Sequence, residues 1–133
     1  MRAQYHLRES PDGLLAWDVH RLADLASRLT PEIIPLGKIR ELDEPFWQTG
    51  GNGPLTCREI GEHAKLIDDT DLQYPVIVDP DGRVMDGMHR VCKALNLGMN
   101  GISAYRLPEL PEPDFVGVVP EDLPYEDEMI LPE

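Results

Sequence analysis

The segment from residue 74 to residue 98, YPVIVDPDGRVMDGMHRVCKALNLG, constrains the fold more strongly than any other part of the chain. An apolar VIV run, a Pro-Asp-Gly turn and the sequence RVM predict a β-hairpin in which Gly82 takes a positive φ. Apolar residues at helical spacing then predict a helix over 88–97, with Gly98 at its C-terminal cap. A hairpin that leads directly into a helix indicates a sheet with a helix packed against it.

Further elements on both sides of this segment complete a small domain. The patterns predict a helix over 18–29 capped by Asp18, a short strand in EIIPLGKIREL, a helix over 57–68 opened by the capping box TCRE, and a final strand in GISAYRL. This order predicts an α+β fold, with a short mixed sheet and flanking helices. We expect residues 1–107 to form the domain, with its core in 33–107.

The length of the chain, 133 residues, suits one domain that folds without metal or disulfide staples. Its two cysteines, Cys57 and Cys92, are interpreted as small buried hydrophobic residues. No apolar run is long enough to span a bilayer, and the N-terminal sequence is too polar for a secretory signal. We therefore expect cytoplasmic localisation and no membrane partner.

Acidic residues are concentrated in a proline-rich C-terminal arm, residues 108–133. The arm has nine acidic and no basic residues, which leaves 12 basic against 16 acidic residues in 1–107, a net charge there of −4. This balance disfavours non-specific nucleic-acid binding. The prolines predict an extended arm, for which a solvated tail is favoured over a dedicated partner-binding segment. Apolar residues of the arm are expected to lie against the body or a second subunit: Phe115, Val116, Val118, Val119, Tyr125, Met129, Ile130 and Leu131.

The sequence DGMHR, at the expected junction of strand and helix, is the candidate functional site. Gly87 permits a sharp turn, and the free backbone N–H groups of Met88, His89 and Arg90 would lie at the positive end of the helix dipole, a place that favours phosphate. The side chains of His89 and Arg90 add hydrogen-bond donors. Local chemistry supports equally well a structural role, with Asp86 as a helix cap and Gly87 as a turn residue.

Over residues 33–107 the chain resembles the ParB/sulfiredoxin superfamily, through IIPLGKIREL, LIDDTDLQ, YPVIVDPDGRV and DGMHRVCKALNLG in that order. The resemblance implies nucleotide-phosphate contact through the DGMHR motif, with ATP, ADP or CTP and Mg²⁺ as the expected cofactors. Gly87, His89 and Arg90 would then contact phosphate, and Asp86 would cap the helix or support them.

Departures from the family pattern reduce the number of activities that the resemblance implies for this chain. Sulfiredoxin chemistry needs a cysteine where this chain has Met88, and the partition proteins add a DNA-binding region where this chain has its acidic arm. The layout is closest to stand-alone members such as the free-serine kinase, which uses a glutamate near the first strand as its base. Glu41 and Glu44 are the candidates, with Glu32 more distant, although a surface carboxylate is the favoured explanation for each one alone.

Other polar and aromatic residues have simpler explanations. Asp79 and Asp81 flank the hairpin turn and suit magnesium, but turn hydrogen bonds explain them better. The remaining histidines, His6, His20 and His63, lack zinc spacing, so no metal site is predicted. Phe46 and Trp47 are expected to pack, with stacking on a nucleotide base as the alternative.

Two functions follow from these patterns. The first is a stand-alone ParB-like domain that binds a nucleotide or other phosphate ligand at DGMHR, with phosphoryl transfer or nucleotide hydrolysis served by His89 and by Glu41 or Glu44. The alternative is a non-catalytic, regulatory or antitoxin-like module that binds a protein partner, or a second copy of the chain, through the acidic arm. Whether the protein is an enzyme stays open at this point.

Overall fold

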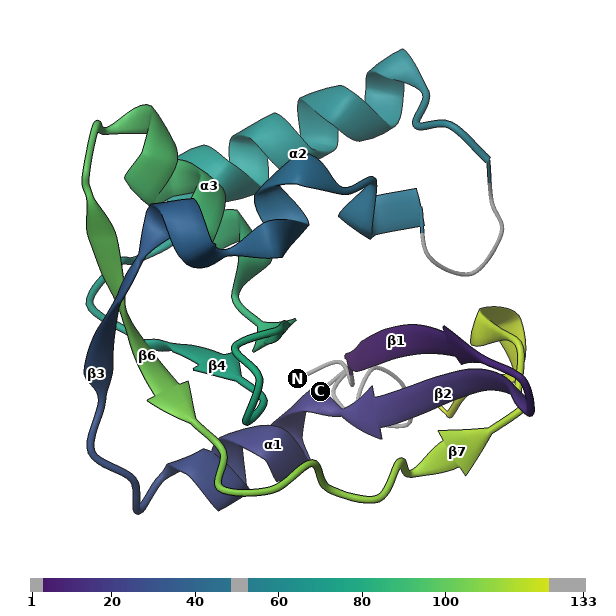
Figure 1. Ribbon diagram of the computed structural model, residues 1–133. Coiled ribbons are helices and arrows are strands. Elements are labelled where there is room, and N and C mark those ends of the chain that lie inside the picture. The colour runs from purple at the N-terminus through teal and green to yellow at the C-terminus, as the bar shows by residue number, and fades with distance from the viewer. Residues whose placement is uncertain (1–3, 49–52, 125–133) are drawn as a thin grey trace, which may run out of the picture.

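The computed structural model describes residues 4–48 and 53–124. Within them the strands form a four-stranded sheet of order β3-β6-β4-β5 and a three-stranded sheet of order β1-β2-β7 (Figure 1). The four-stranded sheet is mixed, because β6 pairs antiparallel with β3 and parallel with β4. Its strands are β3 (Glu32–Pro35), β4 (Val76–Val78), β5 (Val84–Asp86) and β6 (Gly101–Arg106). The predicted α+β class and mixed sheet are confirmed.

The helices are α1 (Val19–Ala26), α2 (Cys57–Asp69) and α3 (Met88–Asn96), and each begins where the sequence predicts. The Asp18 side chain accepts from the backbone N–H of His20, and Thr56 forms the predicted capping box with Glu59. Helix α1 ends three residues earlier than predicted, because the Ser27 backbone and hydroxyl both bond back to Asp24.

The strand predicted in EIIPLGKIREL is correct only for its first half. After Pro35 the chain turns into two short 3₁₀ segments, Leu36–Lys38 and Arg40–Asp43, which we call η1 and η2. Pro35 still faces Gly101 across the sheet, and the Leu36 N–H donates to the Asn100 carbonyl. The second half of the segment therefore folds back over the sheet and buries Leu36 in the core.

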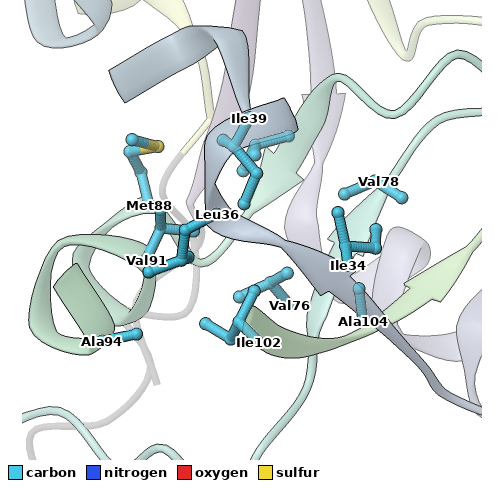
Figure 2. Close-up of a cluster of buried hydrophobic side chains, with 11 residues drawn as sticks. Ile34, Leu36, Ile39, Val76, Val78, Met88, Val91, Ala94, Ile102 and Ala104 are labelled. Atoms are coloured by element: carbon cyan, nitrogen blue, oxygen red, sulfur yellow. The ribbon is translucent and has the colours of Figure 1, made fainter. Parts of the chain in front are cut away.

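The core lies on both faces of the four-stranded sheet. Figure 2 shows the larger cluster, in which α3 and the η1 region cover one face and Val76 and Val78 point into it. The opposite face carries Ile77, which packs with Trp17 and Leu22 from β2 and α1. Successive residues of a strand point to opposite faces, so a strand covered on both sides needs an unbroken apolar run. That requirement explains the VIV sequence.

The N-terminal hairpin of β1 (Tyr5–Ser10) and β2 (Gly13–Asp18) is not predicted from the sequence. The turn signal is present as Ser-Pro-Asp-Gly, and Gly13 has a φ of 104°. Polar residues on β1, such as His6 and Arg8, hide the strand pattern, because they face a polar cavity rather than water.

The arm is extended, as predicted, and as far as residue 124 it lies along the three-stranded sheet (Figure 1). Its short strand β7 (Phe115–Val116) pairs with β2. The Trp17 indole donates to the Pro111 carbonyl at 2.8 Å, and Asp114 binds Arg21 at 3.0 Å. Phe115 thus lies against the body. Val116 is half exposed, and the expectations for Tyr125, Met129, Ile130 and Leu131 fall outside the described residues.

Two further expectations concern the cysteines and membranes. Cys92 is partly buried against the core, where burial raises the pKa of its thiol. Cys57 is exposed, so its interpretation as a buried residue is wrong; it occupies the first turn of α2, which has no buried residue. Over the described ranges, no helix combines the length and the apolar character needed to cross a membrane.

Candidate functional site

The strand-to-helix junction depends on Gly87, which is the N-cap of α3 and has a φ of 104°. A Cβ at this position would lie 2.6 Å from Val76 Cγ1 and 2.8 Å from Arg90 Nη2. Only glycine fits both the backbone conformation and this space. Asp86 ends β5 and does not act as the N-cap residue, so the capping role considered for it is wrong.

Arg90 is held across the junction by Asp86, with 3.1 Å between Arg90 Nη2 and Asp86 Oδ2. Burial raises the pKa of Asp86, and the neighbouring Arg90 opposes that shift. The Arg90 backbone N–H donates to the Gly87 carbonyl, so it is not free for a ligand as the sequence predicts. Arg90 Nε, in contrast, is buried without a hydrogen-bond partner in the described part of the chain.

His89 lies in a stack of three rings with His63 and Trp47. His63 Nδ1 and His89 Nε2 share a hydrogen bond at 2.8 Å, and the centroid of the Trp47 ring lies 4.1 Å from His63 and 4.8 Å from His89. Burial lowers the pKa of His89, and His63 and Arg90 lower it further. His89 is therefore neutral near pH 7 and offers hydrogen bonding rather than charge.

His63 is not a candidate from the sequence, because it has no zinc spacing. The usable signal was its position on α2, three residues after Ile60 and four before Ile67, on the apolar face of the helix. A histidine in such a place needs a polar partner, and the fold supplies His89. Trp47 packs on these imidazoles, which is the packing role expected for it.

Glu41, on η2, is buried beside the start of β5. Its Oε2 accepts from the Val84 backbone N–H at 3.2 Å and lies 3.0 Å from Arg83 Nε, while its Oε1 has no partner among the described residues. Glu44 is more exposed and binds the two terminal nitrogens of Arg83 at 3.0 and 2.7 Å. The hydrogen bond from Arg83 lowers the pKa of Glu44.

The fold brings these glutamates to the DGMHR motif. Glu41, Glu44 and Met88 line a small cavity of about 220 Å³, together with Trp47 and neighbouring residues. Glu32 lies elsewhere, at the sheet edge, where it pairs with Arg106 at 3.3 Å. Of the three glutamates considered as a base, only Glu41 and Glu44 are therefore near the motif.

A larger cavity of about 650 Å³ is lined by the same two glutamates. Arg83 of the hairpin and His6 and Arg8 of β1 also line it. The sequence does not reveal this site, because its residues come from segments that are distant in the chain. Burial, with a smaller contribution from Arg8, lowers the pKa of His6 to about 3, so His6 is neutral.

The hairpin-turn interpretation of Asp79 is confirmed. Its carboxylate accepts from the backbone N–H groups of Asp81 and Arg83, both at 2.9 Å, and binds Arg8 at 3.1 Å. Gly82 takes the positive φ that the turn needs. Within residues 4–48 and 53–124, no group of three histidine, cysteine or acidic side chains is placed to hold a metal ion.

Comparison of the chain with models of protein families, with curated proteins and with solved structures finds no match in any of the three. The resemblance to the ParB/sulfiredoxin superfamily stays a prediction that rests on the motif and its order in the sequence.

Proposed function

We propose that the protein binds a nucleotide or another phosphate ligand at the junction of β5 and α3, with Glu41 as the base for phosphoryl transfer or nucleotide hydrolysis. The observation that carries the proposal is the cavity shared by Glu41, Glu44 and Met88. The sequence suggests Met88 and the two glutamates for one site on separate grounds, and Met88 is distant from both glutamates in the chain.

The junction has the chemistry of an anion site. Among the described residues, no side chain caps helix α3 and no backbone group accepts from the N–H groups of Met88 and His89, which lie at the positive end of the helix dipole. Arg90 adds a guanidinium whose Nε is not used within the described residues. Together these groups would hold phosphate oxygens by charge-assisted hydrogen bonds.

Glu41 is the better base of the two glutamates. Both carboxylate oxygens of Glu44 are bound to Arg83, whereas Glu41 keeps Oε1 unpartnered in the described structure. A base must accept a proton through an oxygen that is not already engaged. Glu41 also lines both cavities, so it can face a phosphate ligand on one side and a second reactant on the other.

Magnesium would arrive with the nucleotide. Asp86 is the carboxylate nearest the expected phosphates in sequence, and it is already paired with Arg90. With no three-ligand group in the described residues, the ion would keep most of its contacts with phosphate and water, as Mg²⁺ does in many nucleotide sites. The ion would supply charge neutralisation, and the protein would supply Arg90 and the helix N-terminus.

Thermal-shift titration with ATP, ADP, CTP and GTP, with and without Mg²⁺, tests the proposal. A ligand that binds only the folded state raises the melting temperature, and we expect one nucleotide to do so. Arg90→Ala should abolish the shift, while the matched variant Arg28→Ala, at an exposed arginine after α1, should keep it. The absence of a shift with all four nucleotides would overturn the proposal.

A further inference from the structure

The larger cavity contains polar groups that have no hydrogen-bond partner in residues 4–48 and 53–124. Arg8 uses Nε for a hydrogen bond to His6 Nε2 at 2.9 Å and Nη1 for Asp79 at 3.1 Å. Its Nη2 is buried and has no partner within the described residues, and the same holds for Glu41 Oε1. Both residues line this cavity. Buried polar atoms are normally paired, so an unpaired donor and an unpaired acceptor at one cavity point to a missing partner.

Arg83, the other cation of the cavity, has no such spare group. Its Nε binds Glu41 at 3.0 Å, and both terminal nitrogens bind Glu44. One guanidinium therefore faces two carboxylates. Any further anionic group brought to these residues would find every nitrogen of Arg83 already engaged with a carboxylate, and the two carboxylates would repel it.

The charges around the cavity leave a negative excess. Asp79 balances Arg8, Arg83 and the nearby Arg40 balance the two glutamates, and His6 is neutral. Glu9, an exposed residue of β1, adds another carboxylate to the lining. A ligand for this cavity must therefore bring positive charge to the glutamates, and it must also offer an acceptor to Arg8.

We propose that the larger cavity binds a small primary amine that also carries an oxygen acceptor. The ammonium group donates to Glu41 Oε1, and the oxygen of the ligand accepts from Arg8 Nη2. A simple carboxylate would be repelled by the excess negative charge of the cavity. A neutral alcohol would leave that charge uncompensated. The site shares Glu41 with the nucleotide proposal, but amine binding needs neither Arg90 nor the backbone of α3, so it can be tested without a nucleotide.

Titration of the full chain with ethanolamine, followed by amide and arginine Nε resonances in NMR spectra, tests this site. Val84 N–H and Arg83 Nε both bind Glu41, and Arg8, which binds His6 through Nε, also lines the cavity, so all three signals should shift together. Ethylamine lacks the acceptor and should bind more weakly, while ethylene glycol and acetate lack the amine and should produce no saturable shift. Equal binding of ethylene glycol, tighter binding of acetate, or no saturable shift with ethanolamine would overturn the proposal.

Three variants locate the binding. Glu41→Gln, which keeps the shape and removes the charge, should weaken ethanolamine binding by about tenfold, the effect of losing one charged hydrogen bond. Should Glu41→Gln fail to fold, Glu9→Gln tests the same charge excess at an exposed position and should weaken binding by a smaller factor. Glu62→Gln, at an exposed glutamate of α2 outside the cavity, is the matched control and should bind as the natural chain does. Unchanged binding in both Glu41→Gln and Glu9→Gln would contradict the assignment.

Arg90→Ala separates this proposal from the nucleotide proposal. The titration uses no nucleotide, so Arg90→Ala should leave ethanolamine binding unchanged even where it abolishes a nucleotide-dependent thermal shift. Loss of ethanolamine binding in a folded Arg90→Ala protein would contradict the proposal that the amine binds in the larger cavity without Arg90.

Discussion

The β5–α3 junction and the larger cavity are assembled in different ways. At the junction, Asp86 and Arg90 are four residues apart and form an ion pair, and Gly87 lies close to the Arg90 side chain. The wall of the larger cavity joins Arg8 of β1, Glu41 of η2 and Arg83 of the hairpin, which meet only when the chain has folded. Local geometry therefore fixes the first site, and long-range packing fixes the second.

The largest effect expected at the junction is that of Gly87→Ala. A Cβ would clash with Val76 and would force alanine into a left-handed conformation, so the free energy of unfolding should fall by about 4 kcal/mol. Urea unfolding measures the loss. Gly98→Ala is the matched control, because Gly98 has a φ of 76° but no atom within 4 Å of the added Cβ. It should lower the free energy of unfolding only by the cost of placing alanine in the left-handed conformation, about 1 kcal/mol. Equal losses in the two variants would show that Val76 does not set the requirement.

At the cavity, Glu41→Ala should be the most costly change. It removes the acceptor for the Val84 N–H and a partner of Arg83, and we expect a loss of about 3 kcal/mol in the free energy of unfolding. Glu44→Ala removes only solvent-exposed contacts with the same arginine and should cost far less. Chemical denaturation of both variants measures the two losses in the free energy of unfolding. Similar losses would mean that the burial of Glu41 does not make it more important for stability than Glu44.

The cavity should also respond to pH through His6. Its folded pKa of about 3 lies below the ordinary value of 6.5, so between these two values the unfolded chain binds a proton that the folded chain does not. The free energy of unfolding should therefore fall as the pH drops from about 6.5 toward 3, by about 2.5 kcal/mol at pH 4.5 from His6 alone. His6→Gln keeps an acceptor for Arg8 and removes the titration. Denaturation at pH 7 and pH 4.5 should show a smaller acid loss in the variant, and an equal loss would rule His6 out as the cause.

The smallest expected effect concerns Asp114, which connects the C-terminal arm to the N-terminal hairpin that lines the cavity. Asp114 accepts from the Asp18 backbone N–H and binds Arg21, so it holds the arm to the N-terminal hairpin. Asp114→Ala should lower the free energy of unfolding by about 1 kcal/mol. Amide hydrogen exchange should become faster in β1 and β2 and stay unchanged in β5. Glu112→Ala is the control, since Glu112 contacts Arg21 through its backbone carbonyl. Equally accelerated exchange in β5 would mean that the stability of the β1–β2 hairpin and that of β5 are coupled.

This difference in assembly also determines how much of the protein can be predicted from its sequence. The hairpin turn, the two side-chain-capped helices and the Gly87 turn are specified by neighbouring residues, and the predictions made from those residues are correct. The β1–β2 hairpin is not predicted, because His6 and Arg8 occupy positions where a two-residue alternation expects apolar or solvent-facing side chains. Their role becomes clear only when β1 lies beside Glu41 and Phe46.

The candidate site divides in the same way. The DGMHR motif and the two glutamates can be proposed from the sequence, since the first is a local pattern and the second comes from the family resemblance. The ring stack of His63, His89 and Trp47 cannot, because it joins three separate elements. The position of His63 on the apolar face of α2 indicates that it needs a polar partner, but no short-range pattern identifies which residues supply the contacts.

The pairing of β2 with β7 has a consequence for the order in which the chain folds. Leu15 lies opposite Val116, so this ladder closes a loop that includes most of the protein. Closure of so long a loop is slow compared with formation of the β4–β5 hairpin, whose strands are adjacent in sequence. During synthesis, the four-stranded sheet can form as soon as β6 has been made, whereas the N-terminal sheet waits for β7. A chain still on the ribosome would thus complete the junction of β5 and α3 before β7 is added to the edge of β2.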